Sequence, residues 1–219
     1  MRVLVADDHA IVRRGVREIL EEAPLGLTVN EAGSAAETLK AVRDNTYDII
    51  LLDISFPDGS GLDVLRQIRA DSPQTRVLLL SMYPEEQYAQ RALRSGASGY
   101  LTKDSAPNEL VIAIQKIAVG GKYITQALAE RLADEIGDEV GKAPHETLSN
   151  REFQVLTHLG AGKSIHEIAA EFSLSPKTVS TYRSRLLVKL NLKTTADIIH
   201  YVIENQLAAC RRERLKISY

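Results

Sequence analysis

The chain has 219 residues and a formal net charge of −2, with 44% hydrophobic and 26% charged residues, which is typical of a folded protein of one large or two small domains. Its single cysteine, Cys210, excludes an intramolecular disulfide framework and a cysteine-cluster metal site. No apolar run approaches the roughly 18 residues of a membrane span, and residues 1–20 lack the layout of a signal peptide. We therefore expect a cytoplasmic protein with no membrane partner.

The charged residues are distributed unevenly along the chain. Residues 1–146 carry 16 basic and 23 acidic side chains, a net charge of −7, whereas residues 147–219 carry 11 and 6, a net charge of +5. This asymmetry suggests two domains with different partners, the second partner being a nucleic acid. An ordinary solvated surface explains the same numbers equally well, so the charge alone does not decide between them.

The first part of the chain alternates predicted strands and helices. The predicted strands cover residues 2–6, 27–32, 47–53, 76–81 and 99–102, and the predicted helices cover 10–21, 34–45, 60–70, 84–95 and 107–119. Ser34 with Glu37, and Ser60 with Asp63, have the spacing of a capping box at a helix start, and residues 56–60 predict a tight loop. Five strands alternating with five helices indicate an α/β fold with a doubly wound, five-stranded parallel sheet.

Polar side chains follow these strands at the points where the strands end. Ligands of a parallel sheet bind outside the carboxyl ends of its strands, and the residues expected there are Asp7, Asp8, Asp53, Ser81, Thr102 and Lys103. Helix capping could explain Asp7 alone, and a loop position could explain Ser81 alone. Neither explains why so many polar residues are expected at the same edge of the sheet. Three crowded carboxylates require a cation, and their hard oxygen ligands suit Mg²⁺. A lysine and a hydroxyl can hold phosphoryl oxygens, which leaves Asp53 as the nucleophile of an aspartyl phosphate.

The second part of the chain is predicted to be entirely helical. A short helix is predicted over 125–136 and a linker over 137–146. The helices that follow are expected after Ser149, which forms a capping box with Glu152, and at 164–172, 176–190 and 194–206. The helices at 164–172 and 176–190 are joined by a three-residue turn, which is the layout of a helix-turn-helix.

The helix predicted over 176–190 has two different sides. Val179, Leu186 and Leu190 fall on one side. The opposite side carries Lys177, Thr181, Ser184 and Val188, flanked by Ser180 and Arg185. Small polar and basic side chains opposite an apolar stripe suit a helix lying in the DNA major groove. The same division is also expected of a helix whose outer face is merely solvated.

Two sets of motifs resemble known families. "VLVADDH", "DIILLDISFPDGSGLDVL", "VLLLSM" and "SGASGYLTKD" resemble the receiver domain of bacterial response regulators, which has a flavodoxin-like fold. "LSNREFQVL" and "GKSIHEIAAEFSLSPKTVSTYRSRLLVKLNL" resemble the LuxR-type DNA-binding domain of NarL/FixJ response regulators. The resemblance implies a receiver domain at 1–122, a linker with a short helix at 123–146, and a small all-α helix-turn-helix domain at 147–219.

The receiver resemblance implies a phosphoacceptor rather than an enzyme, with at most self-phosphorylation and self-dephosphorylation. Its phosphoryl donor would be the phosphohistidine of a sensor histidine kinase. The Mg²⁺ ligands that it implies are Asp7, Asp8, Asp53 and the carbonyl of Ser55. The residues that it implies for phosphoryl chemistry are Asp53 as acceptor, Lys103 as phosphoryl ligand, and the switch pair Ser81 and Tyr100. In this switch Ser81 moves toward the phosphate and Tyr100 rotates inward. Ser55 and Tyr83 flank the approach of hydrolytic water, so they should influence the lifetime of the phosphate.

The LuxR-type resemblance implies binding of double-stranded DNA. The DNA contacts that it implies are Lys177, Ser180, Thr181, Ser184, Arg185 and Lys189. The helix at 194–206 would pair two copies, so that Ile198, Ile199 and Val202 are divided between the core and the dimer contact. Phosphorylation would favour a homodimer on paired half-sites, with RNA polymerase as a further candidate partner. The tail residues that could add phosphate contacts, or else remain solvated, are Arg211, Arg212, Arg214 and Lys216.

Three other interpretations fit less of the pattern. Hydrolases of the haloacid-dehalogenase kind carry a nucleophile and an acid two residues apart after their first strand, whereas here the nucleophile lies on the third strand and position 55 is serine. DNA binding independent of phosphate is disfavoured because the whole acidic pocket is intact. A zinc site is disfavoured because no common ligand spacing fits His145, His158, His166 and His200.

Overall fold

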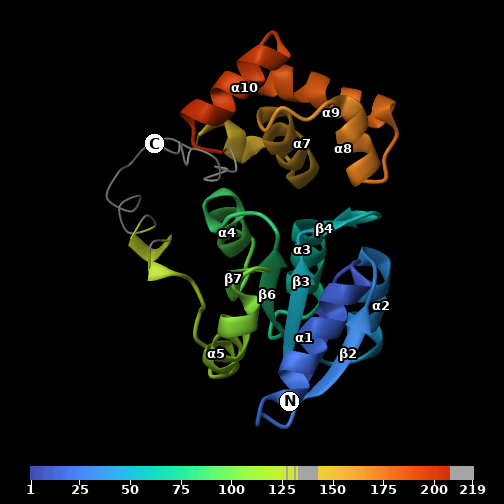
Figure 1. Ribbon diagram of the computed structural model, residues 1–219, viewed down its shortest axis with the longest axis vertical. Helices are drawn as coiled ribbons and strands as arrows, with labels where there is room; N and C mark the ends of the chain where they lie inside the picture. The colour runs from blue at the N-terminus through green and yellow to red at the C-terminus, as the bar shows by residue number, and fades with distance from the viewer. Residues whose placement is uncertain (127, 131, 133–142, 208–219) are drawn as a thin grey trace, which may run out of the picture.

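The computed structural model describes residues 1–126, 128–130, 132 and 143–207. Its first part is a single sheet flanked by helices (Figure 1). The elements of this part are β1 (Arg2–Ala6), α1 (Ala10–Glu22), β2 (Thr28–Ala32), α2 (Ala35–Asp44), β3 (Ile49–Asp53), β4 (Ser55–Phe56), β5 (Gly59–Ser60), α3 (Gly61–Asp71), β6 (Arg76–Ser81), α4 (Glu85–Arg94), β7 (Gly99–Thr102) and α5 (Ala106–Ala118). The order β2-β1-β3-β6-β7, parallel throughout, confirms the predicted doubly wound α/β fold.

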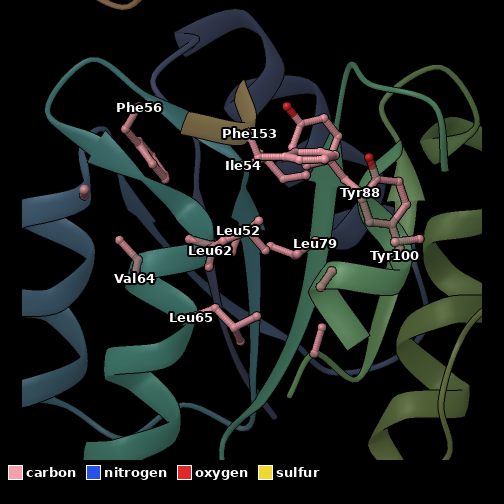
Figure 2. Close-up of a cluster of buried hydrophobic side chains, with 14 of the residues drawn as sticks. Leu52, Ile54, Phe56, Leu62, Val64, Leu65, Leu79, Tyr88, Tyr100 and Phe153 are labelled. Atoms are coloured by element: carbon pink, nitrogen blue, oxygen red, sulfur yellow. The ribbon is translucent and has the colours of Figure 1, made fainter. Parts of the chain in front are cut away.

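The strands of this sheet are buried on both faces because helices cover each one. Ile49 and Leu51 of β3 pack on one side with residues of α1 and α5, such as Leu20 and Ile114. Ile50 and Leu52, which point the other way, pack with α2, α3 and α4 (Figure 2). All four β3 side chains are fully buried. This central strand therefore requires a continuous apolar run, and the first polar residue, Asp53, lies where the strand leaves the apolar interior.

The second part is helical, as predicted, and lies beyond the carboxyl ends of the strands (Figure 1). Its elements are the 3₁₀ helix η1 (Pro144–Thr147) and the helices α7 (Asn150–Gly160), α8 (Ile165–Glu171), α9 (Pro176–Lys189) and α10 (Thr195–Glu204). The capping box predicted at Ser149 and Glu152 is present, and α8 and α10 begin with capping boxes of their own. Within the described residues, none of the helices combines the length and hydropathy needed to cross a membrane.

Some local predictions need correction. The capping box at Ser60 is wrong: the carboxylate of Asp63 instead accepts a hydrogen bond from Asn150 Nδ2 at 2.8 Å. The buried Ser60 hydroxyl has no hydrogen-bond partner among the described residues. At α2 only half of the predicted box forms, because Glu37 accepts from the backbone of Gly33 rather than from Ser34. The predicted tight loop at 56–60 contains the short antiparallel pair β4–β5.

Parts of the sequence prediction lie outside the described residues. These are half of the helix predicted over 125–136, most of the linker over 137–146, the cysteine at position 210 and the basic tail residues 211, 212, 214 and 216.

Gly61 allows the chain to fold back beneath the end of β3. Its backbone N–H donates to the Ile54 carbonyl at 2.7 Å, and a Cβ atom at this position would lie 1.8 Å from the carbonyl oxygen of Asp53. Only glycine permits so close an approach between two backbone segments. The position of Asp53 at the sheet edge therefore depends on a missing side chain eight residues further along the chain.

We expect Gly61→Ala to lower the free energy of unfolding by about 1–3 kcal/mol, because backbone atoms must shift to admit the new methyl group. Gly15→Ala is a matched control: this glycine lies within α1, and apart from the backbone of its own helix no described atom lies within 4 Å of its would-be Cβ. That substitution should stabilise the helix by about 0.5–1 kcal/mol. Chemical denaturation of both variants measures the difference, and equal effects would contradict the close-approach argument.

Candidate functional site

Three buried charged side chains meet at the carboxyl edge of the sheet. Asp7 follows β1, Asp53 ends β3, and Lys103 follows β7, so that elements distant in sequence each contribute one group. The ammonium of Lys103 lies 2.6 Å from Asp7 Oδ2 and 2.9 Å from Asp53 Oδ2. None of the three side chains is more than 7% exposed. The structure thus brings together three of the residues that the sequence predicted at this edge.

The protonation behaviour of Asp53 reflects these opposing surroundings. Burial raises the pKa of Asp53 to about 6, the positive charge of Lys103 opposes this rise, and the neighbouring Asp7 adds to it. For Lys103, burial alone would lower the pKa, but the two carboxylates outweigh it and raise the pKa. The ion pair with Lys103 favours the carboxylate form of Asp53, which is the form that acts as an oxygen nucleophile.

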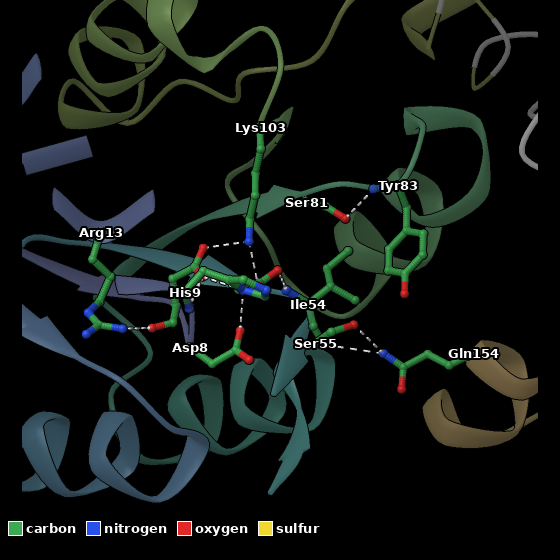
Figure 3. A network of polar contacts seen from close by, with 11 residues as sticks. Asp8, His9, Arg13, Ile54, Ser55, Ser81, Tyr83, Lys103 and Gln154 are labelled. Atoms are coloured by element: carbon green, nitrogen blue, oxygen red, sulfur yellow. Dashed lines mark hydrogen bonds and ion pairs between the residues drawn. The ribbon is translucent and has the colours of Figure 1, made fainter. Parts of the chain in front are cut away.

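The same edge has the donor set of a divalent-cation site. Ligand atoms of Asp7, Asp8, His9 and Asp53 all lie within 4.8 Å of one another. Asp7 Oδ2 and Asp8 Oδ1 are buried, with Lys103 Nζ 2.6 Å from the first and His9 Nδ1 2.8 Å from the second. Buried carboxylate oxygens with remaining acceptor capacity fit a hard cation such as Mg²⁺. Ser55, whose carbonyl was predicted as a ligand, begins β4 and lies beside these acids (Figure 3). It lines a pocket together with Asp8, His9 and Asp53.

The predicted switch residues both contact the backbone of Tyr83. Ser81 is fully buried, and its hydroxyl accepts a hydrogen bond from the Tyr83 N–H at 3.0 Å (Figure 3). Tyr100 is only 1% exposed and donates to the Tyr83 carbonyl at 2.8 Å. The Tyr100 ring is therefore turned inward in this structure, and the two side chains meet at one loop residue.

The polar side of α9 is open to solvent. Lys177, Thr181, Ser184 and Arg185 are exposed, whereas Val179 and Leu186 on the other side are fully buried, in agreement with the predicted division. The remaining two predicted DNA contacts differ from these four. Ser180 is half-buried, and the ammonium of Lys189 lies 2.6 Å from a carboxylate oxygen of Glu152, at the start of α7.

A contact between the two parts of the chain was not predicted from the sequence. Arg91 of α4 donates to the carbonyls of His145, Glu146 and Leu148, and to the side chain of Asn150, at 2.7–3.3 Å. Its guanidinium also lies over the ring of Phe153, 4.5 Å from the centroid. An arginine on a helix surface carries no sequence signal for such a role.

The same contact extends from α7 to the loops around Asp53. Gln154 Nε2 donates to the hydroxyl of Ser55 at 3.2 Å and lies 3.5 Å from the Ile54 carbonyl (Figure 3). His158 Nε2 and the Tyr83 hydroxyl share a hydrogen bond of 2.8 Å. Ser55 and Tyr83 are the residues that the sequence placed beside the path of hydrolytic water, and α7 holds both.

His158 is buried at this contact. Its side chain is 4% exposed and packs edge-on against Phe172, 4.9 Å between centroids. Burial lowers the pKa of His158 to about 4, and the nearby Glu171 only partly opposes the shift. The ring is therefore neutral at pH 7 and serves as a packing and hydrogen-bonding group.

Comparisons with known proteins give a consistent result. Residues 3–115 match the model of the response regulator receiver domain, and residues 146–202 match that of bacterial regulatory proteins of the luxR family. The response regulator UvrY of Escherichia coli (strain K12) is 35% identical over 216 residues, which cover 98% of each chain. A two-component response regulator of the LuxR family from Aurantimonas sp. is 37% identical with a TM-score of 0.57, over 63% of this chain and 98% of that one. The response regulator RcsB in an RcsB–DNA complex is 25% identical with a TM-score of 0.57, over 93% and 98%.

The buried state of His158 predicts a loss of stability in acid. Its pKa is about 4 in the folded chain, against 6.5 for an unperturbed histidine. As the pH falls below 6.5 the unfolded chain binds the proton first, so the free energy of unfolding decreases until the pH reaches about 4. Well above pH 6.5 His158 is neutral in both the folded and the unfolded chain, so its ionisation does not change the free energy of unfolding.

We expect His158→Gln, which retains a polar partner for Tyr83, to lose less stability than the wild type between pH 7 and pH 5 in chemical denaturation. His166→Gln, which changes an exposed histidine on α8, is the control and should behave like the wild type. Identical pH dependence of His158→Gln and the wild type would contradict the assignment.

Proposed function

The chain belongs to the response regulators, with a receiver domain followed by a LuxR-type DNA-binding domain, and from that premise we propose that it is a two-component transcription regulator controlled at Asp53. A sensor histidine kinase phosphorylates Asp53, and the phosphorylated protein dimerises and binds specific double-stranded DNA. The observation that carries this proposal is the buried Asp53 carboxylate, ion-paired with Lys103 among acidic side chains at the sheet edge.

The chemistry assigned to the site is phosphoryl transfer to a carboxylate. A carboxylate oxygen of Asp53 attacks the phosphorus atom, and the bond from phosphorus to the donor breaks. Lys103 compensates the charge of the transferred group, and Ser81 can donate a hydrogen bond to one of its oxygens. Asp7, Asp8, Asp53 and the Ser55 carbonyl would hold Mg²⁺, which supplies positive charge to the phosphoryl oxygens. The phosphate would draw the Ser81 hydroxyl away from the Tyr83 N–H, and the loop at Tyr83, which also accepts from Tyr100, would respond.

The proposed control acts through pairing of the DNA-binding domains. We assign the receiver to residues 1–122, the linker to 123–146 and the DNA-binding domain to 147–219, a division supported by the two family matches. On α10, Ile198 and Val202 are fully buried, whereas Ile199 is half-buried and Ile203 is 61% exposed. The last two offer the apolar surface for a second copy. Paired half-sites would then lie about 34 Å apart or a multiple of that distance.

The partners that follow are a kinase phosphohistidine, DNA and a second copy of the chain, with RNA polymerase as a further candidate. A bacterial cytoplasm is the compartment that contains all of them. The curated relatives are response regulators rather than metabolic enzymes, and we propose at most self-phosphorylation and self-dephosphorylation at Asp53.

Phosphorylation is predicted to require both Asp53 and a divalent cation. The full chain should become phosphorylated with acetyl phosphate and Mg²⁺, as measured by intact-protein mass spectrometry. Asp53→Ala, or an excess of chelator, should abolish the mass increase. Asp104→Ala is the matched control, because it removes an exposed acid next to Lys103, and it should be phosphorylated normally. Turnover of simple phosphomonoesters by the wild type would instead favour the hydrolase interpretation.

The same treatment should tighten DNA binding by the wild type and not by Asp53→Ala. Affinity is measured for the wild type and for Asp53→Ala, each with and without the phosphodonor, on a DNA sequence selected by the phosphorylated protein. Equal affinity in all four cases would contradict the control by phosphorylation and leave the DNA-binding assignment intact.

The side chains of α9 are predicted to divide into base contacts and backbone contacts. Thr181→Ala should relax selection at one base pair by about 1–3 kcal/mol, as read by selection from random DNA. Arg185→Ala should weaken binding to all sequences and lower the slope of log affinity against log salt by about 1. Arg14→Ala removes an exposed arginine of α1 and should change neither quantity. Unchanged selection and salt slope in both α9 variants would exclude this face.

A further inference from the structure

The pocket around Asp53 is bounded by both domains. It has a volume of about 250 Å³. The receiver residues that line it include Asp8, Ser55, Met82, Tyr83 and Lys103, and the DNA-binding domain contributes Glu171 and Phe172 from the end of α8. A cavity of this size accommodates a small phosphodonor, but it does not accommodate a folded domain that presents a phosphohistidine.

The wall formed by α8 is held in place from two sides. Arg151 of α7 donates to the Phe56 carbonyl at 2.9 Å and lies over the ring of Phe172, 5.1 Å from the centroid. Gln154 and His158, one turn apart on the same helix, contact Ser55 and Tyr83. The N-terminal end of α7 and the segment before it are fixed to α4 by Arg91, whose hydrogen bonds go to residues 145–150. Docking of the DNA-binding domain and closure of the pocket are therefore one structural state.

This docked state leaves the DNA-binding side of α9 uncovered. Lys177, Thr181, Ser184 and Arg185 are exposed while α7 contacts the receiver. Figure 1 shows α9 on the side of the second domain away from the sheet. The surface that docking hides is therefore the approach to Asp53, and the surface that reads DNA remains accessible.

An ion pair holds Glu171 in this wall. Its carboxylate lies at the mouth of the pocket, 2.5 Å from the ammonium of Lys163. Because Lys163 compensates its charge, Glu171 restricts the pocket through the position of its side chain.

We propose that the docked DNA-binding domain is a gate over Asp53 that selects phosphodonors by size, with Glu171 and Phe172 as the specificity-determining residues and Arg91 as the residue that keeps the gate closed. This inference rests on the proposed function of Asp53. In transfer from an acyl phosphate, a carboxylate oxygen of Asp53 forms a bond to phosphorus as the bond to the acyl oxygen breaks, and a carboxylate leaves on the side opposite Asp53. The leaving group therefore occupies the volume that the α8 wall bounds.

The test compares two acyl phosphates that differ only in the leaving group. Phosphorylation rates of the full chain are measured with acetyl phosphate and with benzoyl phosphate, in the presence of Mg²⁺. Arg91→Ala removes the distant contact that holds α7, and Glu171→Ala changes the wall itself. Arg14→Ala and Glu204→Ala are matched controls, because each removes an exposed charge outside the interface. Thermal unfolding verifies that every variant is folded.

We expect Arg91→Ala to accelerate both reactions and the benzoyl reaction more. If the gate is open about a tenth of the time in the wild type, full opening raises the rate about tenfold, because the rate scales with the competent fraction. Glu171→Ala should give a smaller acceleration of the same kind, and the two controls none. Wild-type rates and an unchanged ratio of donors in both variants would overturn the gate.

Two further outcomes distinguish failure of the gate from failure of the phosphorylation site. If no protein takes up phosphate, the proposed function of Asp53 is refuted rather than the gate. Binding to a short nonspecific duplex at low salt should be the same for unphosphorylated wild type and Arg91→Ala. Much tighter binding by Arg91→Ala would mean that docking hides the DNA-reading surface, which contradicts the inference.

Discussion

The ion pairs of Lys103 are the constraint on which the rest of the site depends. Two carboxylates at the end of a fully buried sheet would repel each other and resist ionisation, and a single ammonium within 3 Å of both makes the arrangement possible. Strands β1, β3 and β7 must be parallel and in register to present these groups at one edge. Gly61 then lets the chain pass close to the backbone of Asp53, an approach that any larger residue would block.

The sequence was sufficient for the architecture and for the residues at the sheet edge. Apolar runs such as residues 49–52 identify buried strands, and the parallel arrangement brings their ends together whatever the details of the loops. The failures were local, and the one at Ser60 had a tertiary cause. Asp63 has the correct spacing for a capping box, but Asn150, 87 residues away, uses its carboxylate. Short-range spacing cannot register a competitor from another part of the chain.

The contact between the domains could not be predicted for the same reason. Arg91, Gln154 and His158 are ordinary residues of amphipathic helices, and their partners are largely backbone carbonyls and hydroxyls. A pattern search detects clusters of like chemistry, such as the acids around Asp53, but not single polar groups that meet across an interface. His158 attracted attention only as a metal ligand, whereas the structure uses it as a neutral, buried hydrogen-bonding ring.

The partners of Arg91 have a consequence for how this chain can vary. Three of the groups that it binds are carbonyl oxygens of residues 145–148, and every amino acid supplies a carbonyl. The sequence of this segment can therefore change without loss of the hydrogen bonds from Arg91, provided that its backbone path is retained. Position 91 has no such freedom, because a lysine cannot fan several donors across a set of carbonyls as a guanidinium does. Selection for these hydrogen bonds should thus fall on position 91 rather than on the side chains of residues 145–148.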